Sequence, residues 1–304
     1  TSFPDNSEGR WSVDVVTAGG EFLRASQDEN RDLFWGLRGG GGNFGIATGF
    51  EYRLHEVGPT ILGGPIIFPF TQARDLLEFF VEFAATAPDE LNMDCVIVAP
   101  PGAKPMVMIE VCYSGDLATG EKVIAPIRRF SKPLADQIKP MPYATLQTAG
   151  DAANAAGRNY YVKSGFVEKT VPGLFDDLLA GYSPDPGRAT VVVLQQLGGA
   201  IGRVRSDATA FPHRGAKFDL LVLGGWDDAS QNERHIAWVK GLWAGLEPYT
   251  RGFYFNTSIG DSQEKVRANF AGNYPRLVQL KDRYDPGNLF HLNANVQPSS
   301  GGRA

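Results

Sequence analysis

The sequence is poor in the residues that mark several common classes of protein. Of its 304 residues, two are cysteine and four are histidine. Cys95 and Cys112 lack metal-binding spacing, and the scattered histidines do not indicate a metal site. We expect the two cysteines to be free thiols in neighbouring strands, and a disulfide is the alternative.

Long apolar runs and an excess of positive charge are also missing. No apolar stretch approaches the ~20 residues that span a bilayer, and no signal-like segment follows Thr1. The net charge of −5 and the pI near 5.5 argue against non-specific nucleic-acid binding. With 43% hydrophobic and 21% charged residues, the composition is typical of a soluble globular protein with one large or two ordinary domains. The residues do not indicate a cellular compartment.

Glycine, by contrast, is concentrated in one short loop at residues 39–42. The spacing Gly40-x-Gly42-x-x-Gly45 satisfies the dinucleotide fingerprint, which requires a strand before it and a helix after it. Here the order is reversed, because residues 28–37 predict a short helix and residues 46–54 alternate as a strand does. A Rossmann nicotinamide site is therefore disfavoured, and the absence of Gly-Lys-Ser/Thr excludes a Walker A loop. Two interpretations remain: a turn with a packing role, or a loop whose backbone approaches a ligand.

The periodicity of the remaining chain predicts an α+β fold. The β-like runs are 93–99, 106–113, 160–167, 190–197 and 217–226, and the main amphipathic helices are 71–86, 119–130, 171–182 and 230–246. This interleaving favours an antiparallel sheet with helices on one face. A hairpin at 12–25, a short strand at 252–257 and two C-terminal helices, the first capped by Asp261, complete the prediction. Gly58-Pro59 marks a domain boundary.

Several motifs, in order along nearly the whole chain, carry a resemblance to a known family. They are Asp32-Leu33-Phe34-Trp35-Gly36-Leu37-Arg38 leading into the glycine loop, Phe50-Glu51-Tyr52-Arg53-Leu54, Phe211-Pro212-His213-Arg214, Tyr284-Asp285-Pro286-Gly287-Asn288-Leu289-Phe290 and Leu292-Asn293-Ala294-Asn295. The chain resembles the C-terminal part of the berberine-bridge-enzyme-like FAD-linked oxidases, of the vanillyl-alcohol oxidase and p-cresol methylhydroxylase superfamily. Nothing matches the family's first half, which carries the pyrophosphate-binding loop and the residue that can hold flavin covalently.

The resemblance implies that different parts of the chain have different roles. Residues 1–58 and 251–304 would be part of a two-subdomain FAD-binding domain, and residues 59–250 would form the substrate-binding domain. The implied activity is oxidation of a small-molecule alcohol, sugar or secondary metabolite, with hydride passing to FAD and O2 as acceptor. The missing N-terminal FAD-binding segment would be needed in cis or as a separate chain. The alternatives are a truncated, flavin-free module that binds a ligand or partner, and a non-redox cyclase that uses the same pocket.

The resemblance also assigns cofactor-binding residues. They are Gly41, Gly42, Asn43, Phe44, Gly45, Ile46, Tyr254, Asn256, Asn293 and Asn295. The glycine loop would approach the flavin through its backbone. Without the resemblance, Asn293 and Asn295 would be ordinary loop asparagines.

Two residues are candidates for catalysis. Tyr254 and Asn256 match the first and third positions of the family's Tyr-x-Asn-Tyr motif, and the fourth position, a catalytic tyrosine in several relatives, is Thr257. A threonine hydroxyl is a poorer base than a phenolate of pKa ~10, so the usual deprotonation step is in doubt. Asp219 lies in an apolar strand, where burial would raise its pKa and suit it to acid–base work. A strand-end carboxylate that faces water is the open alternative, although the resemblance puts a catalytic or substrate-orienting residue here.

Overall fold

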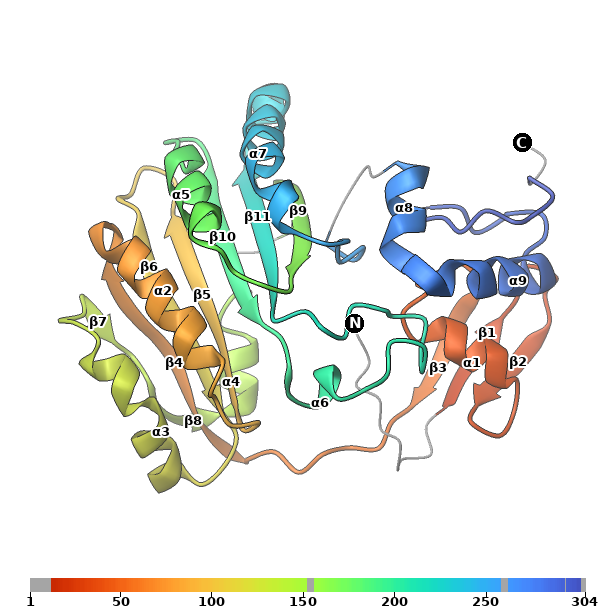
Figure 1. Ribbon diagram of the computed structural model, residues 1–304, viewed down its shortest axis with the longest axis horizontal. Coiled ribbons are helices and arrows are strands. Elements are labelled where there is room, and N and C mark those ends of the chain that lie inside the picture. The colour runs from red at the N-terminus through yellow and green to blue at the C-terminus, as the bar shows by residue number, and fades with distance from the viewer. Residues whose placement is uncertain (1–11, 152–155, 258–261, 293, 302–304) are drawn as a thin grey trace. The chain divides into compact units, whose positions relative to one another are not determined.

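The computed structural model describes residues 12–151, 156–257, 262–292 and 294–301, and the chain divides into two compact units (Figure 1). The terminal unit comprises the described parts of 1–55, 200–216 and 252–304, and the central unit comprises those of 56–199 and 217–251. The sequence predicts one domain over all of 59–250. The structure instead puts residues 200–216 in the terminal unit. The assignment of the units to flavin and substrate stays a prediction.

An antiparallel sheet forms the middle of the central unit. Its strands are β4 (Thr60–Pro69), β5 (Leu91–Ala99), β6 (Met106–Tyr113), β7 (Ala135–Asp136), β8 (Lys139–Pro142), β9 (Asn159–Val167), β10 (Ala189–Gln196) and β11 (Phe218–Trp226). The order is β7-β4-β6-β5-β10-β11-β9, with β8 paired to β4. All five predicted runs lie in this sheet, so the predicted α+β fold is confirmed. Strand β4 escaped prediction because Gly63, Gly64 and Pro65 interrupt its β-like pattern.

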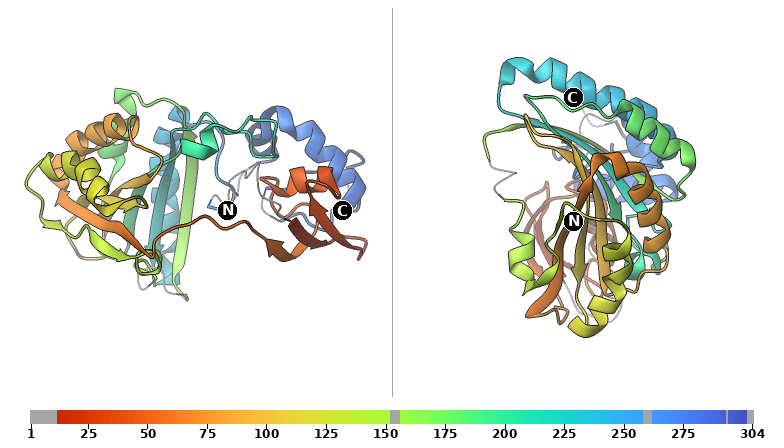
Figure 2. Two further views of the ribbon diagram at one scale, coloured as in Figure 1. Left: turned by 90° about the horizontal axis from the view of Figure 1, so that it is seen from below. Right: turned by 90° about the vertical axis from the view of Figure 1, so that its left-hand side faces the viewer.

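Helices cover one face of this sheet. The helices and 3-10 turns of this unit are η1 (Phe70–Gln72), α2 (Ala73–Ala84), α3 (Leu117–Arg129), α4 (Tyr143–Gln147), α5 (Pro172–Gly181), η2 (Ala229–Gln231), α7 (Asn232–Leu246) and η3 (Glu247–Tyr249). The short α6 (Gly199–Gly202) begins at the last residue before the segment 200–216 of the terminal unit. Helices α2, α5 and α7 lie on the same side of the strands (Figure 2). Alternate strand residues such as Ile97 and Val222 join Phe80 of α2 and Leu246 of α7 in one buried core. The short α4 instead contacts β4.

The two cysteines are free, as expected. Cys95 pairs with Ile109 and Cys112 pairs with Asn92 across the β5–β6 ladder. Cys95 belongs to the core beneath the helices. Cys112 lies three positions beyond Ile109 on β6, so the Cys112 side chain points to the opposite face of the sheet. This separation excludes a disulfide between the two cysteines.

The terminal unit contains a small sheet and three main helices. Its elements are β1 (Ser12–Val16), β2 (Phe22–Ser26), α1 (Arg31–Leu37), β3 (Ile46–Glu51), α8 (Gln263–Phe270), η4 (Ala271–Asn273) and α9 (Tyr274–Tyr284), and the strand order is β2-β1-β3. The predicted hairpin, the helix before the glycine loop and the strand after it are confirmed. Val15, Phe34, Phe44 and Leu277 are fully or almost fully buried in its core.

Three local predictions are wrong or altered. Residues 252–257 form no strand but a turn, closed by the bond from Thr257 N to Tyr254 O at 3.0 Å. Gly252 starts it at φ +63°, a conformation that extended β-structure does not use. Ser262 caps α8 by accepting from Lys265 N, whereas Asp261 lies outside the described residues. The helix predicted from Thr71 begins with η1 and has no side-chain cap.

Candidate functional site

A cavity of about 260 Å³ lies in the terminal unit, between the glycine loop and the C-terminal segment. It is lined by Gly40, Gly41, Gly42, Asn43, Phe255, Asn256, Leu289, Phe290, Leu292 and Ala294. The loop follows α1 directly and leads into β3. Segments far apart in the sequence therefore form one site.

The glycines of the loop differ in what requires them. A Cβ on Gly40 would lie 2.4 Å from the carbonyl oxygen of Gly36, and one on Gly39, at φ +119°, would lie 2.4 Å from Phe211 N. Packing alone therefore excludes side chains at both positions. A Cβ on Gly42 would meet nothing within 4 Å. Gly42 presents bare backbone to the cavity although the protein leaves room for a side chain.

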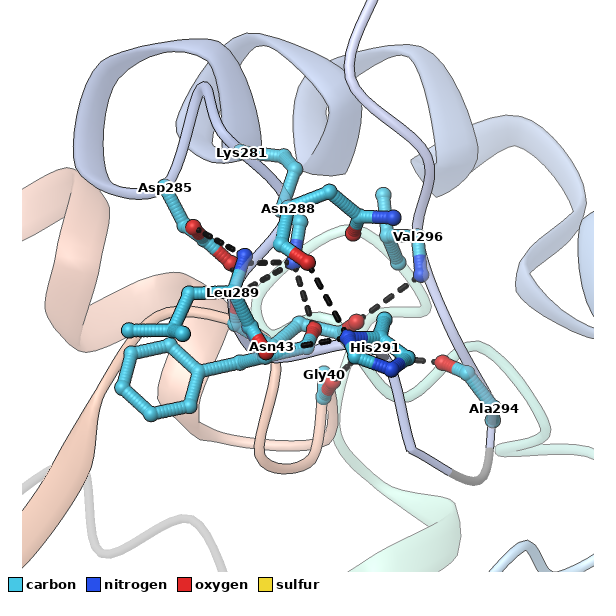
Figure 3. Close-up of polar contacts among 10 residues, drawn as sticks. Gly40, Asn43, Lys281, Asp285, Asn288, Leu289, His291, Ala294 and Val296 are labelled. Carbon is cyan, nitrogen blue, oxygen red and sulfur yellow. Dashed lines mark hydrogen bonds and ion pairs between the residues drawn. The ribbon is translucent and has the colours of Figure 1, made fainter. Parts of the chain in front are cut away.

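Asn43 joins the two walls of the cavity (Figure 3). Its Nδ2 donates to Gly40 O at 2.8 Å and to Ala294 O at 3.0 Å, and its Oδ1 accepts from Val296 N at 2.8 Å. The amide thus uses both donors and one acceptor within the protein. Asn43 lines the cavity, but its side chain holds the scaffold.

A buried ion pair holds the backbone of Asn43 in place. Lys281 and Asp285 are fully buried, and Lys281 Nζ donates to Asp285 Oδ2 at 2.7 Å, to Phe290 O at 2.6 Å and to Asn43 O at 3.1 Å. Asp285 also accepts from Leu289 N and Phe290 N, at 2.7 and 2.8 Å. Each charge therefore has three partners, the condition under which a buried pair is tolerated.

The hydrogen bonds decide the charge state of this pair. Burial by itself raises the pKa of the Asp285 carboxyl, but the bonds from Lys281, Phe290 N and Leu289 N outweigh it, and the pKa lies below its ordinary value. Asp285 is therefore a carboxylate at neutral pH. The pair fixes the turn that carries Leu289 and Phe290 into the cavity wall.

The segment 200–216 braces the other side of the glycine loop. Trp35 Nε1 donates to Asp207 O at 2.8 Å, and Asn273 Nδ2 donates to Ser206 O at 2.8 Å and Thr209 O at 3.1 Å. Arg214 reaches Thr209 Oγ1 at 2.5 Å. These bonds explain why the segment belongs to the terminal unit.

The structure separates the predicted cofactor residues of the loop into two groups. Gly41, Gly42 and Asn43 line the cavity. Phe44 is fully buried in the core, Gly45 is in close contact with Val15 and Val16, and Ile46 begins β3. Packing accounts for Phe44 and Gly45, whereas the Ile46 side chain is 59% exposed. Contact of these three residues with a cofactor stays a prediction.

Among the predicted residues outside the loop, Asn256 lines the cavity and Tyr254 lies beside it. Asn256 Nδ2 donates to the Tyr254 hydroxyl at 2.8 Å, because the turn folds one residue back on the other. Thr257 Oγ1 donates to Tyr254 O at 3.0 Å. Asn295 follows Ala294, is 7% exposed, and its Oδ1 has no partner among the described residues. Asn293 lies outside the described residues.

Asp219 lies in the central unit, on the face of β11 that points away from the helices. It is 5% exposed, so the alternative of a strand-end carboxylate facing water is wrong. Burial, and then the nearby Asp94, raises the pKa of Asp219 to about 7. Such a group can hold or release a proton near neutrality.

The described residues contain no group of three or more His, Cys, Asp or Glu placed to hold a metal ion. Within the same residues, no helix has the length and apolar character needed to cross a membrane. Sequence reasoning missed Lys281 as part of the site. The available signal was its i, i+4 spacing to Asp285 in a predicted helix.

Comparisons with known proteins show which sequences this chain is similar to. Residues 253–297 match the family described as "Berberine and berberine like". An FAD-linked oxidoreductase of Dictyostelium discoideum is 27% identical over 287 residues, which are 93% of this chain and 62% of the relative. Tetrahydroberberine oxidase of Berberis wilsoniae is 26% identical, over 94% of this chain and 62% of its own length.

The fold has close counterparts among solved structures. The chain superposes on 6-hydroxy-D-nicotine oxidase of Arthrobacter nicotinovorans with a TM-score of 0.83 and 23% identity, over 95% of this chain and 66% of that one. The predicted resemblance to the berberine-bridge-enzyme-like FAD-linked oxidases is confirmed by these comparisons. The chain spans about 62% of the length of the curated relatives described here.

Proposed function

We propose that this chain is the C-terminal part of an FAD-dependent oxidase, in which the terminal unit contacts the flavin and the central unit binds the substrate. The proposal depends on the cavity beside Gly42, where backbone without a side chain faces open space although no neighbouring protein atom excludes a Cβ there. Backbone that approaches a ligand closely is the usual reason for such a glycine.

The residues present fit a flavin ring. The ring needs hydrogen-bond donors and acceptors on its edges and apolar contact on its faces. Gly41 and Gly42 supply backbone groups, and Phe255 supplies an apolar wall. Asn295 offers a buried amide oxygen without a partner among the described residues, which is costly unless a ligand satisfies it.

The cofactor, when bound, accepts hydride from the substrate. This chain's residues position the ring and handle the proton. Asp219, with its raised pKa, and Tyr254 are our candidates for the proton-handling residues. Since Thr257 replaces the family's tyrosine, we propose that Asp219 carries the proton that leaves the substrate.

The substrate is a small molecule, and O2 is the proposed electron acceptor. Relatives named for oxidation of 6-hydroxy-D-nicotine and of tetrahydroberberine support a secondary metabolite. The missing N-terminal part of the FAD site is proposed to come in cis or as a separate chain, as the shorter span relative to those proteins suggests.

Amide NMR tests where the flavin contacts this chain. We expect FAD to shift the Gly41 and Gly42 amide signals and to leave those of strands β5 and β6 in place. No shift at millimolar FAD would favour the flavin-free module instead. For the completed protein, substrate-dependent oxygen uptake tests the oxidase, and turnover without oxygen uptake or flavin reduction would favour the cyclase.

A further inference from the structure

A row of polar side chains crosses four strands of the central sheet, on the face opposite to the main helix layer. Glu110 lies opposite Asp94, Asp94 opposite Gln195, and Gln195 opposite Asp219. In each strand the preceding or following residue (Ile109, Cys95, Leu194 and Phe218) belongs to the core beneath the helices, so these four side chains share the other face. The row contains three carboxyl groups and no basic group.

This row is unfavourable for the protein alone. Like charges directly opposite each other on adjacent strands destabilise a sheet. Gln195 Nε2 donates to Asp94 Oδ2 at 3.4 Å, a long bond. The Oδ1 atoms of Asp94 and Asp219 are buried and have no hydrogen-bond partner within the described residues. With Asp219 only 5% exposed, a missing donor is the simplest account of the arrangement.

The neighbouring row on the same face is apolar. One step of two residues along each strand brings Met108, Val96, Val193 and Leu221 into line. Met108, Val193 and Leu221 are half-buried. The face therefore places a strip of partly accessible apolar side chains beside the carboxyl row.

We propose that Glu110, Asp94, Gln195 and Asp219 form a binding site for the protonated amino group of an amine substrate, whose apolar part lies on the Met108–Leu221 strip. An ammonium group donates up to three hydrogen bonds and neutralises the facing carboxylates, which an uncharged hydroxyl does not do. The inference rests on the proposed function in taking the central unit as the substrate-binding unit.

Proton linkage gives this site a signature. Burial and the nearby Glu110 raise the pKa of Asp94 to about 6, and burial and Asp94 raise that of Asp219 to about 7. A bound cation favours the ionised carboxylates, so binding releases protons near neutral pH. Affinity for the amine should rise as the pH increases from about 5 to 8.

Titration of the purified 304-residue chain with benzylamine tests the site without flavin. We expect measurable binding of benzylamine, with proton release near pH 6.5 and no comparable binding of benzyl alcohol or cellobiose. Asp94→Asn and Asp219→Asn should each weaken the benzylamine affinity by roughly tenfold, since hydrogen bonds to charged groups are the strong ones. Glu110→Gln, at the exposed end of the row, should weaken it less.

Asp75→Asn is the matched control, because it removes one exposed carboxylate from α2, on the helix-covered side. It should leave the affinity unchanged. Equal affinity for benzyl alcohol, preference for cellobiose, no binding of benzylamine, or benzylamine binding that survives Asp94→Asn and Glu110→Gln would each overturn the proposal. Because no step uses flavin, a failure of FAD binding would leave this result untouched.

Discussion

Single residues of the glycine loop have opposite reasons for lacking a side chain. The Gly36 carbonyl oxygen leaves no room for a Cβ on Gly40, whereas a Cβ on Gly42 would face open space. The sequence shows that the loop is unusual, but four consecutive glycines do not reveal which of them is tightly packed and which faces open space. That distinction needs the distances to α1 and α9.

Gly42→Ala and Gly40→Ala should therefore behave differently. We expect Gly42→Ala to change the free energy of unfolding by less than about 0.5 kcal/mol, and to weaken FAD binding by filling the cavity. Gly40→Ala should cost roughly 1–3 kcal/mol through overpacking. Denaturant unfolding and FAD titration of both variants test this. A large loss of stability in Gly42→Ala, or unchanged FAD affinity, would contradict the assignment.

The Lys281–Asp285 pair gives a second residue-scale prediction. Asp285→Asn leaves a fully buried ammonium without its counter-ion and should destabilise the protein by roughly 3–5 kcal/mol. The double variant Lys281→Met with Asp285→Asn should lose less than the sum of the two single changes. Asp32→Asn, which breaks the exposed Arg276–Asp32 pair, is the control and should cost ~1 kcal/mol or less. Urea unfolding measures all four variants. Additive losses would argue against a coupled pair.

The pH dependence of stability reports on Asp219. Its pKa is raised from 3.8 to about 7 in the folded chain, so its contribution is present at low pH and is lost as the pH rises through 7. Asparagine at this position does not ionise. The stability of Asp219→Asn relative to the parent should therefore increase between pH 4 and 8, by at least about 1 kcal/mol. A difference that is flat with pH would show that Asp219 keeps an ordinary pKa.

At the scale of elements, the hydrophobic periodicity and the positions of Gly and Pro predicted most helices and strands. The elements that were not predicted correctly have physical explanations. Strand β4 contains two glycines and prolines that local propensity disfavours, yet it pairs with β6 along eight positions. Residues 252–257 have β-like aromatic residues, but Gly252 turns the chain. Local sequence patterns do not reveal that the segment 200–216 packs against α1, because the hydrogen bonds between them join residues about 170 positions apart in the sequence.

Asn273 tests how that segment is held. Its Nδ2 bonds Ser206 O and Thr209 O, so Asn273→Ala should free residues 206–214 without unfolding the central sheet. Amide hydrogen exchange is the measurement, and we expect faster exchange in 206–214 and unchanged exchange in β5 and β6. Uniform acceleration throughout the chain would indicate global destabilisation instead of local release.

At the scale of the whole molecule, two features support the proposal that a further segment completes the flavin site. Strand β3 pairs with β1 and, among the described strands, has no partner on its other edge. Ile46, Phe50 and Leu54 are 59%, 50% and 86% exposed along it and beyond its end, an apolar surface that suits a further protein segment. The C-terminal end of α1 also faces the glycine loop, and its partial negative charge is unfavourable for a pyrophosphate.

The last prediction follows from this electrostatic arrangement. A strand, not a helix, follows the glycine loop, so no helix N-terminus is available there to hold the FAD pyrophosphate. The isolated chain should bind FAD more weakly than micromolar, and riboflavin, which lacks the phosphates, should bind about as well as FAD. Isothermal titration with both ligands provides the measurement, and Gly42→Ala, which narrows the ring site, should reduce both affinities together. Micromolar or tighter FAD binding, or a clear preference for FAD over riboflavin, would show that this chain holds the pyrophosphate itself and needs no completing segment.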